Sequence, residues 1–165
     1  MREKIRSQYI VYTDGACLNN PGPGSYAFII IPPTSQMLTV SGIAEQTTNN
    51  RMELMAIKRA LEHVYNDRKN LIIKRCTIHI YSDSAYCVNP ILEGWIYNWE
   101  KSGWTTKKGD LVKNVDLWKY IYEFMNKKDY LVIFHKVKGH SGNEYNEKVD
   151  QLAKEALKRC STHKR

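Results

Sequence analysis

The stretch IVYTDGACLNNPGPGSY, residues 10–26, runs from an apolar segment through an aspartate into a turn-rich region. Residues 9–13 are rich in β-branched and aromatic side chains, which predicts a buried strand. The same pattern returns in CTIHIYSDSAY, so that YTDGA at residues 12–16 is echoed by YSDSA at residues 81–85. The echo is too short to be an internal repeat. It predicts two strands that each end in an aspartate.

The length of 165 residues fits a single domain with one hydrophobic core. No apolar run approaches the roughly 20 residues of a membrane helix, and the N-terminal MREKIRSQ lacks the apolar stretch of a signal peptide. The four cysteines are scattered, without a C-x-x-C pair or a histidine cluster at zinc spacing, which predicts reduced thiols. Together these features predict a cytoplasmic protein with no membrane partner.

The chain is basic, with a formal net charge of +8. A positive surface favours a polyanionic partner, and nucleic acid is the commonest one. Solvated lysines without such a partner are the alternative. The charge therefore permits a nucleic-acid-binding function without establishing it.

The remaining pattern predicts an α/β fold. Residues 25–31 and 36–42 form a predicted hairpin around the turn PPTS. Helical spacing begins in TTNNRMELMAIKRALEHVY, where Asn50 and Glu53 have the spacing of a capping box. Because crossovers through helices join parallel strands, the later strands are expected to join the sheet in parallel. They are predicted at residues 76–81 and 130–137, and helices at residues 84–92, with a break at Asn89-Pro90, 116–125 and 146–158.

Four acidic residues stand where acids are least expected. Asp14 and Asp83 each follow a strand, and if these strands are parallel neighbours, both carboxylates emerge at the edge where open α/β sheets bind ligands. Glu53 and Asp150 border the buried stripes of their helices. Each acid alone has a plainer interpretation: a turn for Asp14, a helix cap for Asp83, a capping box for Glu53 and a solvated edge for Asp150.

Taken together, the four acids indicate a metal site. Like charges brought together raise one another's pKa values and destabilise a fold unless a cation neutralises them. A carboxylate cluster without Cys or His favours hard ions, and Mg²⁺ binds a few carboxylates while keeping waters for a phosphate substrate. The pattern therefore predicts metal-assisted phosphoryl chemistry.

Five motifs occur in one order along residues 9–157: TDGACLNNPGPG, TTNNRMELMA, YSDSAY, a block with GWIYNWEKSGW and LVKNVDLW, and KGHSGNEYNEKVDQLA. Together they resemble type 1 ribonuclease H, a family of metal-dependent endonucleases that cut the RNA strand of RNA/DNA hybrids. The similarity to bacterial members of the family is close. It implies a five-stranded mixed sheet, three antiparallel strands and then parallel strands, flanked by helices.

The resemblance also assigns catalytic roles. It implies that Asp14, Glu53 and Asp83 hold one Mg²⁺ ion, and that Asp14 and Asp150 hold a second one that positions the attacking water. Two ions about 4 Å apart stabilise the entering and leaving oxygens of an in-line displacement. Mn²⁺ is an alternative cofactor, and the products implied are a 5′-phosphate and a 3′-hydroxyl. His140, in the loop KVKGHSGN, is implied to carry a proton near neutral pH.

Contacts to the RNA strand would recognise its 2′-hydroxyl, which both donates and accepts a hydrogen bond. The residues that the resemblance assigns to this strand are Cys17, Asn20, Asn49 and Asn50. Helix capping is an alternative role for the two neighbouring asparagines.

The DNA strand is assigned a phosphate pocket, an aromatic channel and a basic protrusion. Aromatic side chains interleaved with lysines are typical of strand binding without sequence readout, although a Trp pair one helical turn apart is also typical of a core. The resemblance places Thr48 and Asn98 in the phosphate pocket, Trp95 and Trp99 in the channel, and Lys101, Lys107 and Lys108 in the protrusion. Trp104 is expected in the core.

The expected organisation is a short basic leader at residues 1–8, a single ribonuclease H domain at residues 9–158 and a basic, disordered tail at residues 159–165. A monomer without an obligate protein partner is expected. Two alternatives stay open: another metal-dependent nuclease or polynucleotidyl transferase of the same broad fold, such as an integrase or a resolvase, and a module that binds hybrids without cutting. The four acids argue against the second, because a pure binder gains nothing from negative charge facing phosphates.

Overall fold

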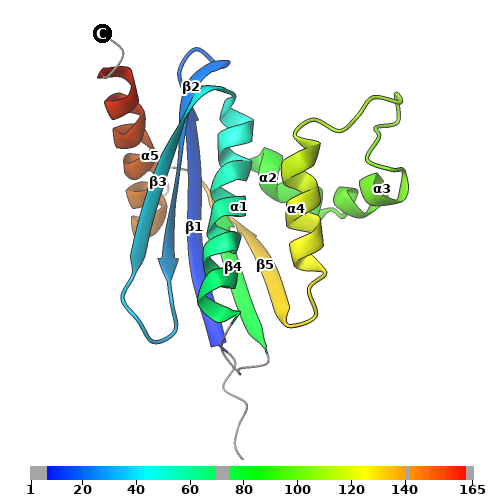
Figure 1. Ribbon diagram of the computed structural model, residues 1–165, viewed down its shortest axis with the longest axis horizontal. Coiled ribbons are helices and arrows are strands. Elements are labelled where there is room, and N and C mark those ends of the chain that lie inside the picture. Colours follow the sequence, from blue (N-terminus) through cyan, green and yellow to red (C-terminus); the bar gives the residue numbers. More distant parts are fainter. Residues whose placement is uncertain (1–6, 70–74, 140–141, 163–165) are drawn as a thin grey trace, which may run out of the picture.

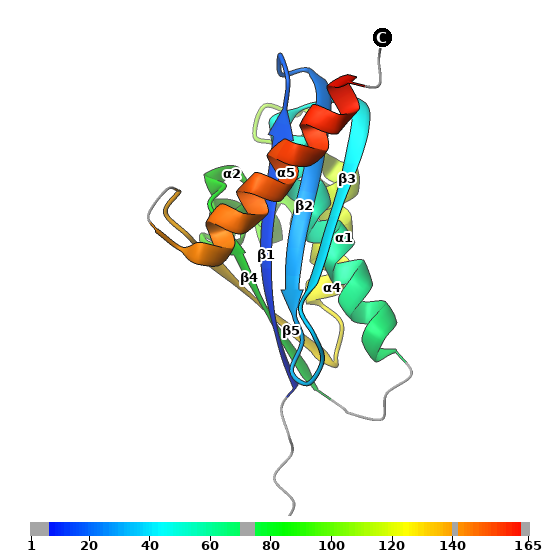
Figure 2. The same ribbon diagram turned by 90° about the vertical axis from the view of Figure 1, so that its left-hand side faces the viewer.

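A mixed five-stranded sheet lies between helices on its two faces (Figures 1 and 2). This computed structural model describes residues 7–69, 75–139 and 142–162. The strands are β1 (Ser7–Cys17), β2 (Gly22–Ile31), β3 (Leu38–Thr47), β4 (Cys76–Ser82) and β5 (Tyr130–Lys136). The helices are α1 (Asn49–Arg68), α2 (Ala85–Leu92), α3 (Trp95–Lys101), α4 (Val115–Met125) and α5 (Glu144–Thr162).

The strands follow the order β3-β2-β1-β4-β5 across the sheet. β1 and β2 pair antiparallel, as do β2 and β3, whereas β1 with β4 and β4 with β5 pair in parallel. The chain passes through α1 before β4, and through α2, α3 and α4 before β5, as parallel neighbours require (Figure 1). The predicted fold class, with three antiparallel strands followed by parallel ones, is confirmed.

The hydrophobic core has one part on each face of the sheet. On the first face, α1 packs against β1 and β2 and next to α4, with Leu54, Ile57 and Leu61 fully buried. On the other face, α5 crosses β1, β2 and β3 and buries Val149 and Ala153 (Figure 2). Complete burial of a valine, leucine or isoleucine side chain contributes about 1.5–3 kcal/mol to the free energy of unfolding. Both helices are therefore fixed to the sheet by their apolar stripes.

β1 is longer than the sequence predicts, because its pairing with β2 continues beyond its pairing with β4. The parallel ladder of β1 and β4 ends at Tyr12 and Tyr81, whereas the antiparallel ladder with β2 runs on to Cys17 and Gly24. Asp14 therefore lies inside a strand rather than after it, opposite Ala27. Its side chain still emerges beyond the end of the parallel ladder.

The cap of α1 also differs from the prediction. Thr48 is the N-cap residue, with extended backbone angles (φ −128°, ψ 161°), and its Oγ1 accepts a hydrogen bond of 3.2 Å from the backbone N–H of Arg51. The capping box predicted for Asn50 and Glu53 is therefore wrong, since both residues already lie within the helix. Glu53 is thus not engaged in a cap.

The break predicted at Asn89-Pro90 is also wrong. Pro90 lies inside α2, which ends two residues later at Leu92. A proline within a helix removes one backbone hydrogen bond. Pro90 is buried, so its ring adds apolar burial that offsets part of this loss.

Both expected domain boundaries shift by a few residues. At the N-terminal side, Ser7 and Gln8 already pair with Cys76 and Thr77, so they belong to the sheet and not to a leader. At the other end, α5 continues to Thr162, and Cys160 is buried because it extends the apolar stripe of the helix. Disorder predicted at residues 159–162 is thus wrong. Residues 1–6 and 163–165 lie outside the described ranges.

Two further expectations concern apolar residues. Trp104 is 8% exposed and belongs to the core, as predicted. Among the described residues, no helix combines the length and the apolar composition that a membrane span requires.

Candidate active site

Three of the four predicted acids come together at one edge of the sheet. Asp14, Glu53 and Asp83 each offer a carboxylate oxygen, and these oxygens all lie within 4.8 Å of one another. Asp14 comes from β1, Asp83 follows β4, and Glu53 lies in the N-terminal part of α1. Asp14 and Glu53 are each only 5% exposed. The structure therefore assembles a carboxylate cluster, with Asp83 partly exposed, from residues that lie up to 69 positions apart in the chain.

Gly15 lets α1 approach β1 closely enough to form this cluster. A Cβ atom at Gly15 would lie 2.4 Å from the backbone nitrogen of Glu53 and 2.6 Å from the carbonyl carbon of Met52. Both are backbone atoms, which cannot move aside without moving the helix. Glycine is therefore required here for close packing, and the DG pair in the first motif is not merely a turn.

The cluster holds its carboxyl groups in an unfavourable environment for negative charge. Burial, followed by the nearby Asp150 and Asp83, raises the pKa of Asp14 to about 7, although hydrogen bonding with Glu53 opposes the shift. Burial and the charge of Asp14 raise the pKa of Glu53 well above its ordinary value. Among the described residues, Glu53 Oε2 has no hydrogen-bond partner. Burial and the neighbouring acids thus both favour the neutral forms of these carboxyl groups.

These features fit a hard divalent cation. The donors are carboxylate oxygens alone, which favour Mg²⁺, Ca²⁺ or Mn²⁺ over softer metals. A cation would supply both a partner for Glu53 Oε2 and a positive charge beside the buried acids. The residues present therefore fit the metal ion that the sequence predicts.

Asp150 borders this cluster from α5 without belonging to its closest group. It raises the pKa of Asp14, so the two carboxyl groups face each other. Its Oδ2 also accepts an ion-paired hydrogen bond of 2.9 Å from Nζ of Lys154, one helical turn later. Lys154 therefore places a positive charge beside the fourth acid.

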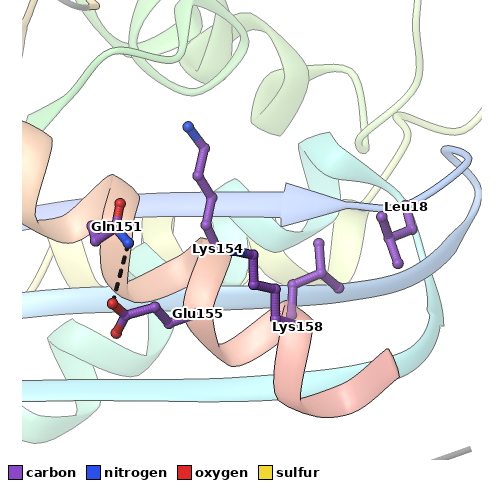
Figure 3. A pocket seen from close by; sticks show the side chains of 6 residues that line it. Leu18, Gln151, Lys154, Glu155 and Lys158 are labelled. Carbon is purple, nitrogen blue, oxygen red and sulfur yellow. Dashed lines mark hydrogen bonds between the residues drawn. The ribbon is translucent and has the colours of Figure 1, made fainter. Parts of the chain in front are cut away.

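A small pocket continues from Lys154 along α5. It has a volume of about 280 Å³ and lies between the turn after β1 and the helix (Figure 3). Lys154 extends away from the pair formed by Gln151 and Glu155, which are joined by a hydrogen bond of 3.1 Å, while Leu18 closes the opposite side near Lys158 (Figure 3). The pocket borders the acid site but contributes none of the four carboxylates.

His140 lies outside the described residues. The segment that leads to it does approach the site, since a Cβ atom at Gly139 would lie 3.4 Å from Oδ2 of Asp83. The proton-carrying role of His140 therefore stays a prediction.

The residues predicted to contact RNA lie around the start of α1. Oδ1 of Asn20 accepts a 2.9 Å hydrogen bond from the backbone N–H of Asn49, which ties the turn after β1 to the helix. The Sγ atom of Cys17 donates weakly to the carbonyl oxygens of Gly22 and Thr47. Asn50 is exposed. Asn20, Asn49 and Cys17 are thus brought together next to the acid cluster.

The residues predicted to contact DNA lie in or just after α3, except Thr48, which is the N-cap residue of α1. A pocket of about 420 Å³ is lined by Trp95, Asn98, Trp99, Ser102, Thr105, Thr106 and Lys107. Trp95 is 44% exposed, so the alternative of a core Trp pair is wrong for this residue. Trp99 is half-buried and packs edge-on against Trp118, with ring centroids 5.4 Å apart. Lys101 and Lys108 are also exposed.

Comparison with known proteins identifies the family. The ribonuclease H family model matches residues 6–158. The chain belongs to the ribonuclease H family. The ribonuclease H of Prosthecochloris aestuarii (strain DSM 271 / SK 413) is 45% identical over 154 residues, which cover 93% of this chain and 98% of that protein. The ribonuclease H of Chlorobium chlorochromatii (strain CaD3) is 43% identical over 157 residues, which cover 95% of this chain and 100% of that protein. The predicted family and enzyme class, an RNA-degrading hydrolase, are thereby confirmed.

Solved structures of ribonucleases H share the fold. LC9-RNase H1, described as a type 1 RNase H with the type 2 active-site motif, superposes with a TM-score of 0.73 at 26% identity, covering 96% of this chain and 75% of that one. LC11-RNase H1 in complex with an RNA/DNA hybrid superposes with a TM-score of 0.65 at 21% identity, covering 92% of this chain and 98% of that one. The second likeness supports the fold alone.

One group of residues in this ribonuclease H escaped the sequence analysis. Nη1 of Arg51 donates to Oδ1 of Asn114 at 3.3 Å, and the amide of Asn114 donates to the hydroxyl of Tyr86 at 3.0 Å. Arg51 and Asn114 lie inside two of the family motifs, TTNNRMELMA and LVKNVDLW, which is the signal that could have drawn attention to them. Their mutual contact could not be read from the sequence, because 63 positions separate them.

Proposed function

We propose that this ribonuclease H is a metal-dependent endonuclease that hydrolyses the RNA strand of RNA/DNA hybrids and leaves a 5′-phosphate and a 3′-hydroxyl. The observation that carries the proposal is the cluster of Asp14, Glu53 and Asp83, with Asp150 beside it. LC11-RNase H1, which has the same fold, was solved in complex with an RNA/DNA hybrid, and we propose the same class of substrate for this chain. The basic charge of this chain, +8, is consistent with a nucleic-acid substrate.

Mg²⁺ is the proposed cofactor, with Mn²⁺ as an alternative. Asp14, Glu53 and Asp83 would hold one ion, and Asp14 with Asp150 would hold a second. When bound, two such ions stabilise the entering and leaving oxygens of an in-line displacement at phosphorus. His140 is the proposed proton carrier.

The side chains of the protein bind and orient the hybrid. We expect Cys17, Asn20, Asn49 and Asn50 to contact the RNA strand, because they lie beside the acid cluster and carry groups that suit a 2′-hydroxyl. The residues proposed for the DNA strand are Thr48, Asn98, Trp95, Trp99, Lys101, Lys107 and Lys108. Lysines that contact the DNA strand would make binding depend on salt concentration, since each phosphate contact releases counterions.

The remaining proposals concern organisation. A single ribonuclease H domain, residues 9–158 as first delimited, would act as a monomer in the cytoplasm without an obligate protein partner. The described strand and helix ends extend this unit to residues 7–162.

The test is cleavage of an end-labelled RNA/DNA hybrid with Mg²⁺, beside duplex DNA, duplex RNA and single-stranded RNA. We expect internal cuts in the RNA strand of the hybrid alone, and we expect them to disappear with chelator or with Asp14→Asn. The exposed Asp110 offers a matched control, because Asp110→Asn makes the same chemical change outside the cluster. Binding of the hybrid without cleavage, with either Mg²⁺ or Mn²⁺, would instead establish a binding module.

A further inference from the structure

A network of polar contacts joins the first turns of α1 and α2 to the start of α4. Arg51 donates to both carboxylate oxygens of Asp116, at 3.0 Å and 2.6 Å, and to Oδ1 of Asn114 at 3.3 Å. The hydroxyl of Tyr86 accepts from the amide of Asn114 at 3.0 Å and from Nε1 of Trp118 at 3.5 Å. The network therefore contacts three helices through five side chains.

The ends of this network lie next to two different parts of the molecule. Arg51 stands two residues before Glu53, and Tyr86 stands three residues after Asp83, so both lie close in the chain to acids of the carboxylate cluster. At the other end, Trp118 packs against Trp99 of α3. The network thus links α1, the helix that carries Glu53, with α3, the helix that carries the exposed Trp95.

Stability alone does not account for these contacts. Asn114 is the N-cap residue of α4 and has a left-handed backbone (φ 58°), yet its side chain makes no capping hydrogen bond. The side chain contacts Arg51 and Tyr86 instead. The ion pair of Arg51 and Asp116 is 34% and 60% exposed, and ion pairs with such exposure contribute little to stability.

We propose that Arg51 is a positioning residue that, through Asp116, Asn114 and Tyr86, fixes the Trp-bearing α3 relative to the carboxylate cluster. The inference rests on the proposed function. A hybrid bound by α3 presents its RNA strand to the acids at a distance that the network sets. Catalysis is sensitive to such placement, since a displacement of about 1 Å can reduce a rate by about 100-fold.

This role differs from direct contact of Arg51 with a phosphate. A positioning residue affects kcat more than the affinity for the hybrid. A phosphate contact would instead weaken binding and reduce its salt dependence, by about one unit in the slope of log affinity against log salt. The two roles therefore give different results for the same variant.

The first experiment compares Arg51→Met with Arg59→Met. Arg59 lies on the same helix and pairs with Glu62, so its replacement removes the same charge and also breaks an ion pair. We expect Arg51→Met to reduce kcat about tenfold or more, with an unchanged melting temperature and hybrid affinity within about twofold. Affinity is measured in the Asp14→Asn background, which keeps the hybrid uncut, across a salt series. Weakened binding with a smaller salt slope would overturn the proposal, as would equal effects of the two variants.

The second experiment tests transmission through Asn114. Tyr86→Phe removes the hydroxyl that accepts from Asn114. Arg51 and Tyr86 share Asn114 as a partner, so we expect the double variant to lose no more kcat than the stronger single variant. The effects of Arg59→Met and Tyr86→Phe on kcat should be independent, so that the double variant shows the product of the two single effects. Independent effects of Arg51→Met and Tyr86→Phe would contradict the network. Absence of hybrid cleavage by the unsubstituted enzyme would reject the proposed function itself, a distinct result.

Discussion

Tyr12 and Tyr81 are partners in the parallel ladder of β1 and β4, and their rings stack with centroids 4.9 Å apart. Each is followed two residues later by an aspartate of the carboxylate cluster, Asp14 or Asp83. The echo of YTD and YSD in the sequence is therefore in register in the sheet. Because the parallel ladder ends at this tyrosine pair, the two aspartates leave it at the same level and on the same edge.

Metal binding should stabilise the protein through Glu53. We expect Mg²⁺ at 100 times its dissociation constant to add about 2.7 kcal/mol to the free energy of unfolding. The Glu53→Gln variant should lose most of this gain, because it removes a charged ligand from the cluster. Thermal unfolding with and without Mg²⁺ measures the effect.

The exposed Glu123 of α4 provides the control for this experiment. Glu123→Gln should respond to Mg²⁺ as the unsubstituted protein does. An equal Mg²⁺ response in Glu53→Gln would show that the metal binds elsewhere.

Stability without metal should depend on pH through Asp14. Its pKa rises from 3.8 to about 7 on folding, so the folded state binds this proton more tightly than the unfolded state. The favourable contribution of Asp14 to the free energy of unfolding is therefore complete below about pH 4 and is lost as the pH rises through 7. Asn carries no charge, so Asp14→Asn should be more stable than the unsubstituted protein at pH 8, by about 1–3 kcal/mol.

Urea unfolding in the presence of chelator at pH 4, 5.5 and 8 measures this difference. The advantage of Asp14→Asn should shrink towards zero at pH 4, where the aspartate is already protonated. A constant difference at all three pH values would mean that the pKa of Asp14 is not raised.

Gly15→Ala should damage both the fold and the metal site. The new Cβ would meet backbone atoms of Glu53 and Met52 at 2.4 Å and 2.6 Å, so α1 must move away from β1. Overpacking of this kind costs about 1–3 kcal/mol. The displaced helix also carries Glu53 out of the cluster, so Mg²⁺ should stabilise the variant less.

Gly103 offers a contrasting substitution. It has a left-handed backbone (φ 71°) and nothing within 4 Å of its Cβ position. Gly103→Ala should cost about 1–2 kcal/mol from backbone strain alone, with a full response to Mg²⁺. Urea unfolding and Mg²⁺ titration distinguish the two variants, and equal Mg²⁺ responses would remove the role assigned to Gly15.

Much of this fold follows from local patterns in the sequence. The strands and the longer helices have strong periodicity, and the parallel crossovers follow from their order. Element ends were harder to predict, because they depend on partners: β1 extends to Cys17 only because β2 continues beside it, and α5 extends to Thr162 with Cys160 buried. The N-cap of α1 is Thr48 rather than Asn50, because the backbone of Thr48 is extended and the helix already begins at Asn49.

The site was predictable to a different extent. The three acids Asp14, Glu53 and Asp83 meet as expected, since two follow from the parallel ladder and one from a helix face. The contact of Arg51 with Asn114 joins helices that no local pattern relates. Long-range polar contacts of this kind depend on the packing of α1 against α4, which composition and periodicity do not determine.

Trp95 and Trp99 should differ in what their removal costs. Trp95 is 44% exposed and lines the pocket on α3, whereas Trp99 packs against Trp118. Trp95→Ala should weaken hybrid binding by about 1–3 kcal/mol, the range for loss of an aromatic contact to a nucleic acid strand, and leave the melting temperature unchanged. Trp99→Ala should weaken binding and also lower the melting temperature, because it leaves a cavity beside the core. Fluorescence anisotropy with an uncut hybrid and thermal unfolding measure the two effects. Unchanged affinity in Trp95→Ala would remove the exposed Trp95 side chain from the proposed DNA-binding surface, since its loss would then cost no contact with the hybrid.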